Sequence, residues 1–219
     1  MRCETGFVAK AIELEGETYR YAVFVPERYT PQRSWPAMLY LHGMGECGDD
    51  GRFHTTVGLG RAIRDHPERF GCIVILPQCR VGLRWEGPME SLALAALGAA
   101  QSDYNIDRNR IALTGLSLGG FGTWSIGARY ADRFCALVPI CGGGDPADAE
   151  TLARVPVWCF HGEADPVVAV ERSREMVEAV RAAGGNVRYT EYAGVTHNSW
   201  DSAYGNPDVI AWMLAQRRP

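Results

Sequence analysis

The sequence predicts an α/β fold built around a mostly parallel β-sheet, and two patterns support this prediction. After Pro31, short apolar stretches recur along the chain, and they are continuous rather than alternating in polarity. Strands of a parallel sheet need this pattern because helices cover both of their faces. Helical segments lie between the stretches, as crossover connections require. The chain has 219 residues, 47% of them hydrophobic, and no repeat or linker, so we expect one domain over residues 1–219.

The expected elements begin with an antiparallel hairpin, in which residues 7–14 and 19–26 form two strands around the tight turn "EGET". Six further strands are expected at residues 37–43, 72–79, 110–117, 136–143, 155–162 and 186–194. Helices are expected at residues 91–104, 118–130, 170–185 and 208–218. The longest candidate loop, between Gly43 and Thr56, follows a strand at its carboxyl end, where open α/β sheets bind ligands.

Charge and composition limit the possible partners. A formal net charge of -4, from 22 Lys and Arg against 26 Asp and Glu, provides no basic footprint for nucleic acid or an anionic membrane surface. The opening "MRCETGFVAK" lacks the pattern of a signal peptide, and no apolar run approaches the ~20 residues of a membrane span. We expect a soluble protein without nucleic-acid or membrane partners, cytoplasmic as given and secreted if an export signal has been trimmed from it.

The cysteine pattern argues against a metal site. Seven cysteines are scattered along the chain without a C-x-x-C pair: Cys3, Cys47, Cys72, Cys79, Cys135, Cys141 and Cys159. This spacing does not match a zinc site, so no metal ligands are expected. Most of these cysteines fall in apolar stretches, where the thiol acts as a small buried hydrophobe. A disulfide between Cys47 and Cys79 is left open because both would lie near the ends of adjacent strands.

Ser117 is the candidate nucleophile. It lies in "GLSLG", directly after a predicted strand and before a predicted helix, which is the strand–turn–helix setting of a nucleophile elbow. A serine held in strained backbone geometry leaves no room for side chains at Gly115 and Gly119, and Gly120 lets the helix lie close to the sheet. The alternative is structural, because serine is also a favoured N-cap residue at the start of a helix.

A serine nucleophile needs a base to take its proton and an acid to hold that base. Asp165, in "HGEADP", follows one predicted strand, and His197, in "GVTHNSW", follows the last one. Both loops lie at the same edge of the sheet as Ser117. The order Ser117, Asp165, His197 is the one expected of an α/β-hydrolase.

Two other acids compete for the role of Asp165. Glu163 lies two residues earlier, and Asp145 follows the preceding strand in "CGGGD". Asp165 is favoured because its "DP" ends the loop where the next helix begins.

Among the other histidines, His42 and His161 each precede a glycine at a strand end and are expected to hold loops by hydrogen bonds. His54 and His66 have polar neighbours and are expected to face solvent. His197 is the only histidine after the final predicted strand.

An acyl-transfer site also needs two donors for the oxyanion. The amide of Leu118, next to the nucleophile, is one candidate. The amide of Met44, in the loop after "AMLYLHG", is the other, because the glycines there let amides turn inward. A phosphate-binding loop is rejected for "HGMGECG" because it lacks the G-x-x-x-x-G-K-[ST] pattern.

Six blocks in order resemble one family: "LHGMGECGDD", "PQC…W", "GLSLGGFGTW", "ICGGGDP", "HGEADPVV" and "GVTHNSWDSAY". From about residue 20 to the C-terminus the chain resembles α/β-hydrolase carboxylesterases of the phospholipase/carboxylesterase or predicted-peptidase type, relatives of acyl-protein thioesterases and feruloyl esterases. The resemblance implies Ser117 as nucleophile, Asp165 as acid and His197 as base, with Met44 and Leu118 at the oxyanion positions.

The resemblance also places Trp85 and Trp200 in the wall of the substrate pocket, and Gly43 is assigned to the same pocket. Trp124, inside the helix after Ser117, is expected to be core. Dienelactone hydrolases carry cysteine at the nucleophile position, so Ser117 counts against them. No segment is long enough for a lid domain, which favours an open site for short acyl esters or esters carried on a polymer.

The function expected is therefore a serine carboxylesterase that forms an acyl-enzyme on Ser117 and needs no cofactor. Its partner would be a small-molecule or polymer-borne ester. Two alternatives are a peptidase of the prolyl-oligopeptidase kind and a non-catalytic binding scaffold. The first usually carries an additional domain over the site, and the second typically lacks a triad member.

Overall fold

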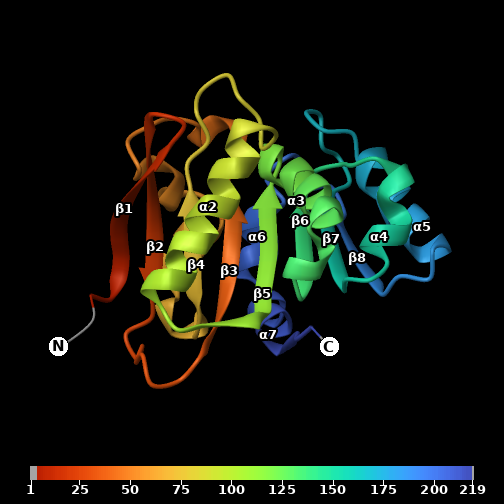
Figure 1. The fold of residues 1–219 in the computed structure, drawn as a ribbon. Helices are drawn as coiled ribbons and strands as arrows, with labels where there is room; N and C mark the ends of the chain where they lie inside the picture. The colour runs from red at the N-terminus through yellow and green to blue at the C-terminus, as the bar shows by residue number, and fades with distance from the viewer. Residues whose placement is uncertain (1–3, 219) are drawn as a thin grey trace.

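Eight strands form one sheet in the computed structural model, which describes residues 4–218 (Figure 1). The strands are β1 (Gly6–Leu14), β2 (Glu17–Val25), β3 (Trp35–Leu41), β4 (Ile73–Pro77), β5 (Ile106–Leu116), β6 (Ala136–Ile140), β7 (Val157–Gly162) and β8 (Val187–Tyr192). Their order across the sheet is β1-β2-β4-β3-β5-β6-β7-β8. The β1–β2 and β2–β4 pairs are antiparallel, and all other pairs are parallel. The predicted mostly parallel sheet with an N-terminal hairpin is confirmed.

The hairpin turns on two residues with positive φ. Glu15 has φ 51° and Gly16 has φ 83°, as a type I′ turn requires. This turn fixes the register, in which Leu14 pairs with Glu17 and Gly6 with Val25.

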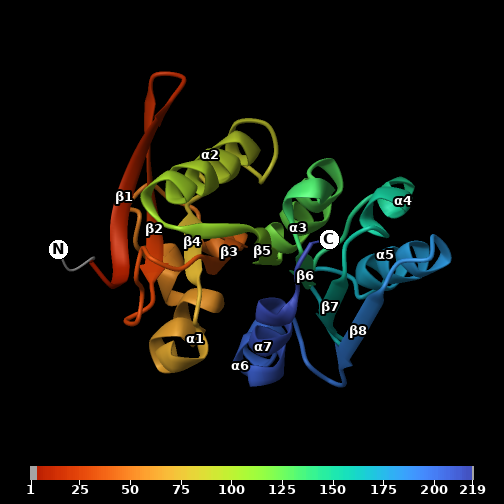
Figure 2. The ribbon, with the colours of Figure 1, turned by 60° about the horizontal axis from the view of Figure 1, so that its bottom comes forward.

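Helices cover both faces of the sheet. They are α1 (Leu59–Asp65), α2 (Pro88–Asp103), α3 (Leu118–Arg129), α4 (Ala149–Leu152), α5 (Glu171–Ala182), α6 (Trp200–Gly205) and α7 (Pro207–Ala215). Figure 2 shows α2, α3, α4 and α5 on one face and α1, α6 and α7 on the other. Short 3₁₀ turns are η1 (Met44–Glu46), η2 (Phe53–Thr56), η3 (Pro67–Arg69), η4 (Ala131–Arg133) and η5 (Pro146–Asp148).

Alternate strand residues supply two separate cores. Leu39 and Leu113 point to the core beneath α2, α3 and α5. Met38 and Ala112, their chain neighbours, point to the core beneath α1, α6 and α7. Successive side chains of a strand face opposite sides of the sheet, so a strand buried on both faces is apolar throughout. This explains the continuous apolar stretches of the sequence.

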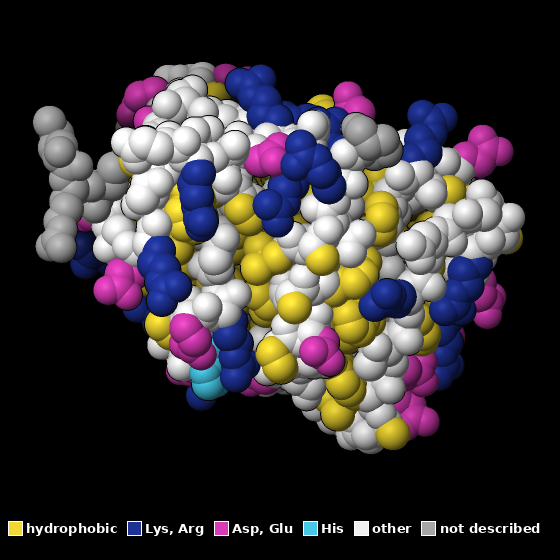
Figure 3. Space-filling model, turned by 90° about the horizontal axis from the view of Figure 1, so that it is seen from below, with side chains coloured by type: hydrophobic (Ala, Val, Ile, Leu, Met, Phe, Trp, Pro, Cys, Tyr) yellow, Lys and Arg dark blue, Asp and Glu magenta, His cyan; other side chains and the backbone are white. Residues whose placement is uncertain are grey.

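Exposed charges of both signs are intermixed on the face opposite the carboxyl ends of the parallel strands. There, Lys and Arg side chains lie among Asp and Glu around a central group of hydrophobic side chains (Figure 3). Within residues 4–218, no helix combines the length and the apolarity that a bilayer crossing demands.

Candidate active site

Ser117 stands on a strained turn between β5 and α3. Its backbone has φ 51° and ψ -114°, a region that residues other than glycine rarely adopt. The backbone is held there by a hydrogen bond from the Ser117 amide to the carbonyl of Ile140 (2.9 Å). Ser117 occupies the N-cap position of α3, but its hydroxyl makes no capping bond. Its Oγ instead lies 2.9 Å from Nε2 of His197, which an ordinary N-cap serine would not do.

The glycines around Ser117 are sterically required. A Cβ on Gly115 would collide with the carbonyl of Gly119, and a Cβ on Gly119 would collide with the carbonyl of Leu41. A Cβ on Gly120 would collide with the carbonyl of Ile140. Each obstacle is backbone, which cannot rotate away. The turn therefore needs three glycines so that β3, β5 and β6 can approach the first turn of α3.

The carboxyl ends of β7 and β8 bring Asp165 and His197 to Ser117. Nδ1 of His197 lies 2.7 Å from Oδ2 of Asp165, so the acid, the imidazole and the hydroxyl form one continuous chain of hydrogen bonds. The Asp165 side chain is fully buried, whereas 18% of the His197 side chain is exposed. This arrangement can deprotonate a serine hydroxyl at a site open to a substrate.

Asp165 is held as a carboxylate by its hydrogen bonds. Oδ1 accepts the backbone amides of Val167 (2.8 Å) and Val168 (3.0 Å). Burial alone would raise the pKa of Asp165, but the hydrogen bonds from His197, Val168 and Val167 outweigh it and hold the pKa below its ordinary value. The acid therefore stays negatively charged near neutral pH, as the stabiliser of an imidazolium must.

The two competing acids, Asp145 and Glu163, accept backbone amides in other loops. Asp145 accepts the amide of Ala147 (3.0 Å) at the start of η5. Glu163 is exposed and accepts the amide of Gly194 (2.9 Å).

Two histidines hold loops, as expected. Nδ1 of His42 bonds the Gly43 carbonyl (2.6 Å), and its Nε2 accepts the Cys79 amide (2.9 Å). Burial lowers the pKa of His42 to about 3, so it remains neutral. His161 bonds the Val168 carbonyl (3.0 Å) and the hydroxyl of Ser173 (2.7 Å).

The expectation that His54 faces solvent is wrong. His54 is fully buried, and its Nε2 bonds the carbonyl of Leu76 at the end of β4 (2.8 Å). Its ring lies 5.5 Å from the ring of His42, centroid to centroid. The polar neighbours misled the prediction because the loop after β3 folds back over β4 and inserts this one side chain. His66, in contrast, has 47% of its side chain exposed.

The loop after β3 lies directly beside Ser117. A Cβ on Gly43 would come within 3.6 Å of the Ser117 Cβ. The carboxylate of Glu46 accepts the Gly43 amide (2.9 Å) and fixes the turn from which the Met44 amide projects. Among the described residues, we find no acceptor for the amides of Met44 and Leu118. Met44 begins η1 and Leu118 begins α3, and first-turn amides have no partner within their own helix.

The pocket residues differ in how they reach the site. Trp200 stands edge-on to His197, with ring centroids 5.3 Å apart. Trp85 is only 1% exposed, packs against Gly122 and donates its indole N–H to the carbonyl of His42 (3.0 Å). The expected wall position of Trp85 is therefore corrected to a buried support behind the loop after β3. Trp124 is core, as expected.

Sequence reasoning missed Cys141, which follows β6 with φ 41° and lies beneath the triad. Ligand atoms of Cys141, Asp165 and His197 lie within 4.8 Å of one another, close enough to hold a metal ion. Burial raises the pKa of Cys141 to about 12, which keeps the thiol protonated. Cys47 and Cys79 are free thiols. Cys47 Sγ donates to the carbonyl of Gly43 (3.9 Å), and Cys79 Sγ donates to the carbonyl of Arg80 (3.6 Å).

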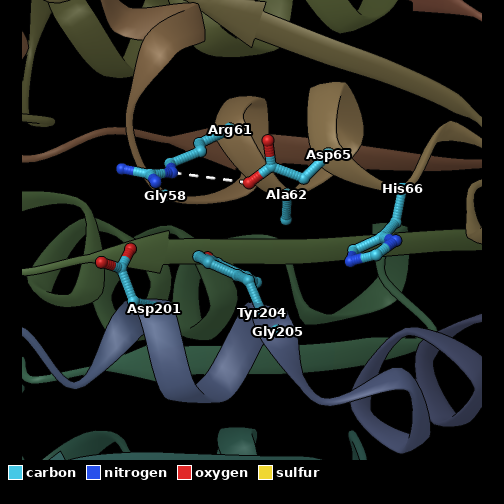
Figure 4. A pocket seen from close by; sticks show the side chains of 8 residues that line it. All are labelled: Gly58, Arg61, Ala62, Asp65, His66, Asp201, Tyr204 and Gly205. Carbon is cyan, nitrogen blue, oxygen red and sulfur yellow. Dashed lines mark hydrogen bonds and ion pairs between the residues drawn. The ribbon is translucent and has the colours of Figure 1, made fainter.

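Two cavities lie away from the triad. One, of about 230 Å³, lies between α1 and α6. The Arg61–Asp65 ion pair lies on one wall, and Asp201 and Tyr204 lie on the other (Figure 4). The second, of about 510 Å³, lies between β1 and residues 50–56. None of the three triad residues lines either cavity.

Comparisons with known proteins point to one family. The family model described as "Dienelactone hydrolase family" matches residues 20–202. The expectation that serine at position 117 counts against these enzymes is therefore wrong. The match extends from β2 to α6, and the nucleophile is one position within it.

Several esterases resemble the chain. The bifunctional acetylxylan esterase/xylanase XynS20E of Neocallimastix patriciarum is 27% identical over 151 residues, which cover 67% of this chain and 21% of that protein. Acyl-protein thioesterase 1 of Gibberella zeae is 28% identical over 107 residues, covering 44% of this chain and 45% of that protein. The chain thus matches about a fifth of the first relative and under half of the second.

The fold matches solved structures over nearly its whole length. The structure of a thermostable esterase superposes with a TM-score of 0.88 at 35% identity, covering 97% of this chain and 63% of that one. The feruloyl esterase module from Clostridium thermocellum superposes with a TM-score of 0.77 at 19% identity, covering 97% of this chain and 89% of that one.

Proposed function

The chain belongs to the dienelactone hydrolase family and has the α/β-hydrolase fold, and from this premise we propose that it is a serine carboxylesterase. One observation carries the proposal. The half-buried Ser117 hydroxyl, on a turn with positive φ, shares a hydrogen bond with His197, whose other nitrogen bonds the buried carboxylate of Asp165. A serine hydroxyl becomes a useful nucleophile only when a base is placed to take its proton.

In the first half of the reaction, His197 Nε2 takes the proton of Ser117 as Oγ attacks the ester carbonyl carbon. Asp165 stabilises the resulting imidazolium through Nδ1. The tetrahedral oxyanion is held by the amides of Met44 and Leu118, which lie at helix starts and favour negative charge. The C–O bond to the alcohol then breaks, and His197 returns the proton to the leaving alkoxide.

The second half repeats these steps with water. His197 takes a proton from water, the hydroxide attacks the acyl carbon, and the same amides hold the second oxyanion. The bond to Ser117 Oγ breaks, the serine recovers its proton from His197, and the carboxylic acid leaves. No step calls for a metal or an organic cofactor.

We propose short acyl or aryl esters as substrates, free or attached to a polymer. The names of the relatives support this class, since they include an acetylxylan esterase, a poly(3-hydroxyalkanoate) depolymerase and feruloyl esterases. The loops at the site support it as well. Each connection between successive described strands holds at most one α-helix, in some cases with short 3₁₀ turns, and none forms a separate lid that could enclose a long acyl chain. The proposal assigns the activity to one domain.

The test combines active-site labelling with substrate turnover. The wild-type protein should react with a fluorophosphonate probe, whereas Ser117→Ala should not. Ser125→Ala is the matched control, because Ser125 lies on α3 and its hydroxyl bonds only Gly122 (3.4 Å). Ser125→Ala should react with the probe as the wild-type protein does. Turnover of aryl acetate and butyrate should exceed that of aryl palmitate by at least about tenfold, since roughly 0.8 kcal/mol per buried methylene is gained only where an apolar tunnel exists.

Labelling or ester hydrolysis by Ser117→Ala would refute the assignment of the nucleophile. A preference for palmitate would refute the short-acyl proposal while leaving the serine mechanism standing.

A further inference from the structure

His161 is a second histidine on the catalytic carboxylate. Its ring lies at the end of β7 and is fully buried. Nε2 lies 3.1 Å from Oδ2 of Asp165, the same oxygen that binds His197. The carboxylate is thus placed between two imidazoles. The reaction as derived above uses only one of them.

The hydrogen-bond partners of His161 require a hydrogen on its Nε2. Nε2 faces two acceptors, the Asp165 carboxylate and the Val168 carbonyl (3.0 Å), so Nε2 must carry a hydrogen. Nδ1 lies 2.7 Å from the oxygen of the Ser173 hydroxyl, whose single hydrogen is donated to the Gly142 carbonyl (3.0 Å). Burial, opposed by the neighbouring carbonyl and carboxylate, lowers the pKa of His161. Nε2 is therefore a hydrogen-bond donor towards Asp165, and Nδ1 is held beside the Ser173 hydroxyl.

We propose that His161 is a positioning residue of the active site, whose Nε2–H holds the Asp165 carboxylate in the orientation that His197 requires. The inference rests on the proposed esterase function, because it concerns the acid of the same triad. His161 touches no reacting atom.

The count of donors to Asp165 explains why one histidine matters. Oδ1 receives two backbone amides and Oδ2 receives two imidazoles, so every lone pair of the carboxylate has a donor. The two amides come from Val167 and Val168, only two and three residues along the chain, and hold one oxygen. Only the imidazoles hold the other oxygen. Without His161, Oδ2 is free to turn away from His197 or to admit water.

The opposite side of His161 is anchored to the structure behind the nucleophile. Besides reaching Nδ1, the Ser173 hydroxyl on α5 lies 3.0 Å from the carbonyl of Gly142. Gly142 packs so closely on α3 that a Cβ there would collide with the backbone of Gly120 and Phe121. His161 thus fixes the position of Asp165 relative to α5 and to α3, the helix that follows Ser117.

Two substitutions separate the roles of the two ring nitrogens. In His161→Gln, the side-chain amide reaches the former Nε2 position and can still donate to Asp165. In His161→Asn, the amide reaches only the Nδ1 position, beside Ser173. We expect the kcat of His161→Asn for an aryl acetate to fall on the order of 10²-fold, the typical cost of a misplaced catalytic group. His161→Gln should recover most of that loss, with KM nearly unchanged in both.

The matched control is His54→Asn, which removes another fully buried histidine bonded to a backbone carbonyl. It should lower the melting temperature without lowering kcat. If His161→Asn does not fold, Ser173→Ala replaces it. That variant keeps the ring but removes the hydroxyl that holds Nδ1 in place, and its kcat should fall about tenfold.

A second measurement does not depend on turnover. The low-field proton resonance of the His197 Nδ1–H bonded to Asp165 should persist in His161→Gln and shift or vanish in His161→Asn. Equal kcat values for the Gln and Asn variants, a change confined to KM, or an unaltered resonance in the Asn variant would overturn the positioning role. Absence of any turnover that depends on Ser117 in the wild type would instead refute the esterase proposal, and the resonance would still decide the role of His161.

Discussion

At the scale of single residues, the environment of Ser117 distinguishes a nucleophile from a helix cap. An N-cap serine turns its hydroxyl towards amides of its own helix. Ser117 occupies that position without such a bond, and its hydroxyl faces His197. A cap would have satisfied the amide of Gly119 or Gly120, whereas the amide of Leu118, at the first helical position, is available for an oxyanion. The local strain at φ 51° thus leaves both the hydroxyl and the amide free for chemistry.

Two glycine substitutions, one in the strained turn and one outside it, should change the free energy of unfolding in opposite directions. Gly119→Ala should lower the free energy of unfolding by about 3 kcal/mol, because the new Cβ would collide with the backbone carbonyl of Leu41. Gly98→Ala is the control. Gly98 lies inside α2 with nothing within 4 Å of a Cβ, so alanine should stabilise the fold by about 0.5–1 kcal/mol. Urea denaturation measures both, and a Gly119→Ala variant as stable as the wild type would contradict the steric argument.

Residues whose role depends on their own strand end could be predicted from the sequence, whereas residues placed by a loop could not. Ser117, Asp165 and His197 each follow a strand that the apolar pattern identifies, and the structure brings them together. His54 and Trp85 lie in or behind long connections, and the hydrophobic periodicity of the sequence does not predict the course of such loops. The sequence predicted His54 exposed and Trp85 in the pocket wall, and both are buried.

At the scale of elements, the short turn η1 determines where the Met44 amide points. The Met44 side chain is 65% exposed, so only its backbone faces the site. Glu46 accepts the Gly43 amide and thereby leaves the next amide, that of Met44, as the free donor. Burial raises the pKa of Glu46, although the amides of the turn oppose this effect. The turn η1 therefore contributes a backbone amide to the site, and the identity of the side chain at position 44 matters little.

Two substitutions at Met44 test that view. Met44→Pro removes the amide hydrogen but suits the first position of a short helix, and the extended Gly43 (φ -81°, ψ -178°) tolerates a following proline. Its kcat should fall by about 10²- to 10³-fold, the usual cost of one oxyanion donor. Met44→Ala keeps the amide and should retain kcat within about threefold. Steady-state kinetics on an aryl acetate measure both kcat values. Similar values for the two variants would show that the Met44 amide is not an oxyanion donor.

Long elements were predictable because packing repeats along them, and short ones were not. The strands and the helices α2, α3, α5 and α7 lie close to their expected positions. Three helices have no such signal: α1, α4 and α6, with 7, 4 and 6 residues. Helices this short are unstable alone. They form because Leu59 on α1, Leu152 on α4 and Tyr204 on α6 bury their side chains in the two cores, which is information that only the tertiary structure contains.

At the scale of the whole molecule, buried neutral histidines make the free energy of unfolding depend on pH. His42 and His54 lie together beneath the loop after β3, with ring centroids 5.5 Å apart. Burial lowers the pKa of His42 to about 3 and that of His54 to about 4. In the unfolded chain both would titrate near 6.5. Between these values the unfolded chain binds more protons than the folded one, so the free energy of unfolding falls as the pH falls.

The acid sensitivity should be measurable for His54 alone. Lowering the pH from 7 to 4 should remove about 3 kcal/mol of stability through this one histidine, because each unit between the folded and unfolded pKa corresponds to about 1.4 kcal/mol. His54→Gln retains a donor for the Leu76 carbonyl but cannot take up a proton. Its free energy of unfolding should therefore depend less steeply on pH than that of the wild type. Urea titrations at pH 7, 6, 5 and 4 provide the comparison, and parallel pH profiles would show that His54 titrates normally in the folded protein.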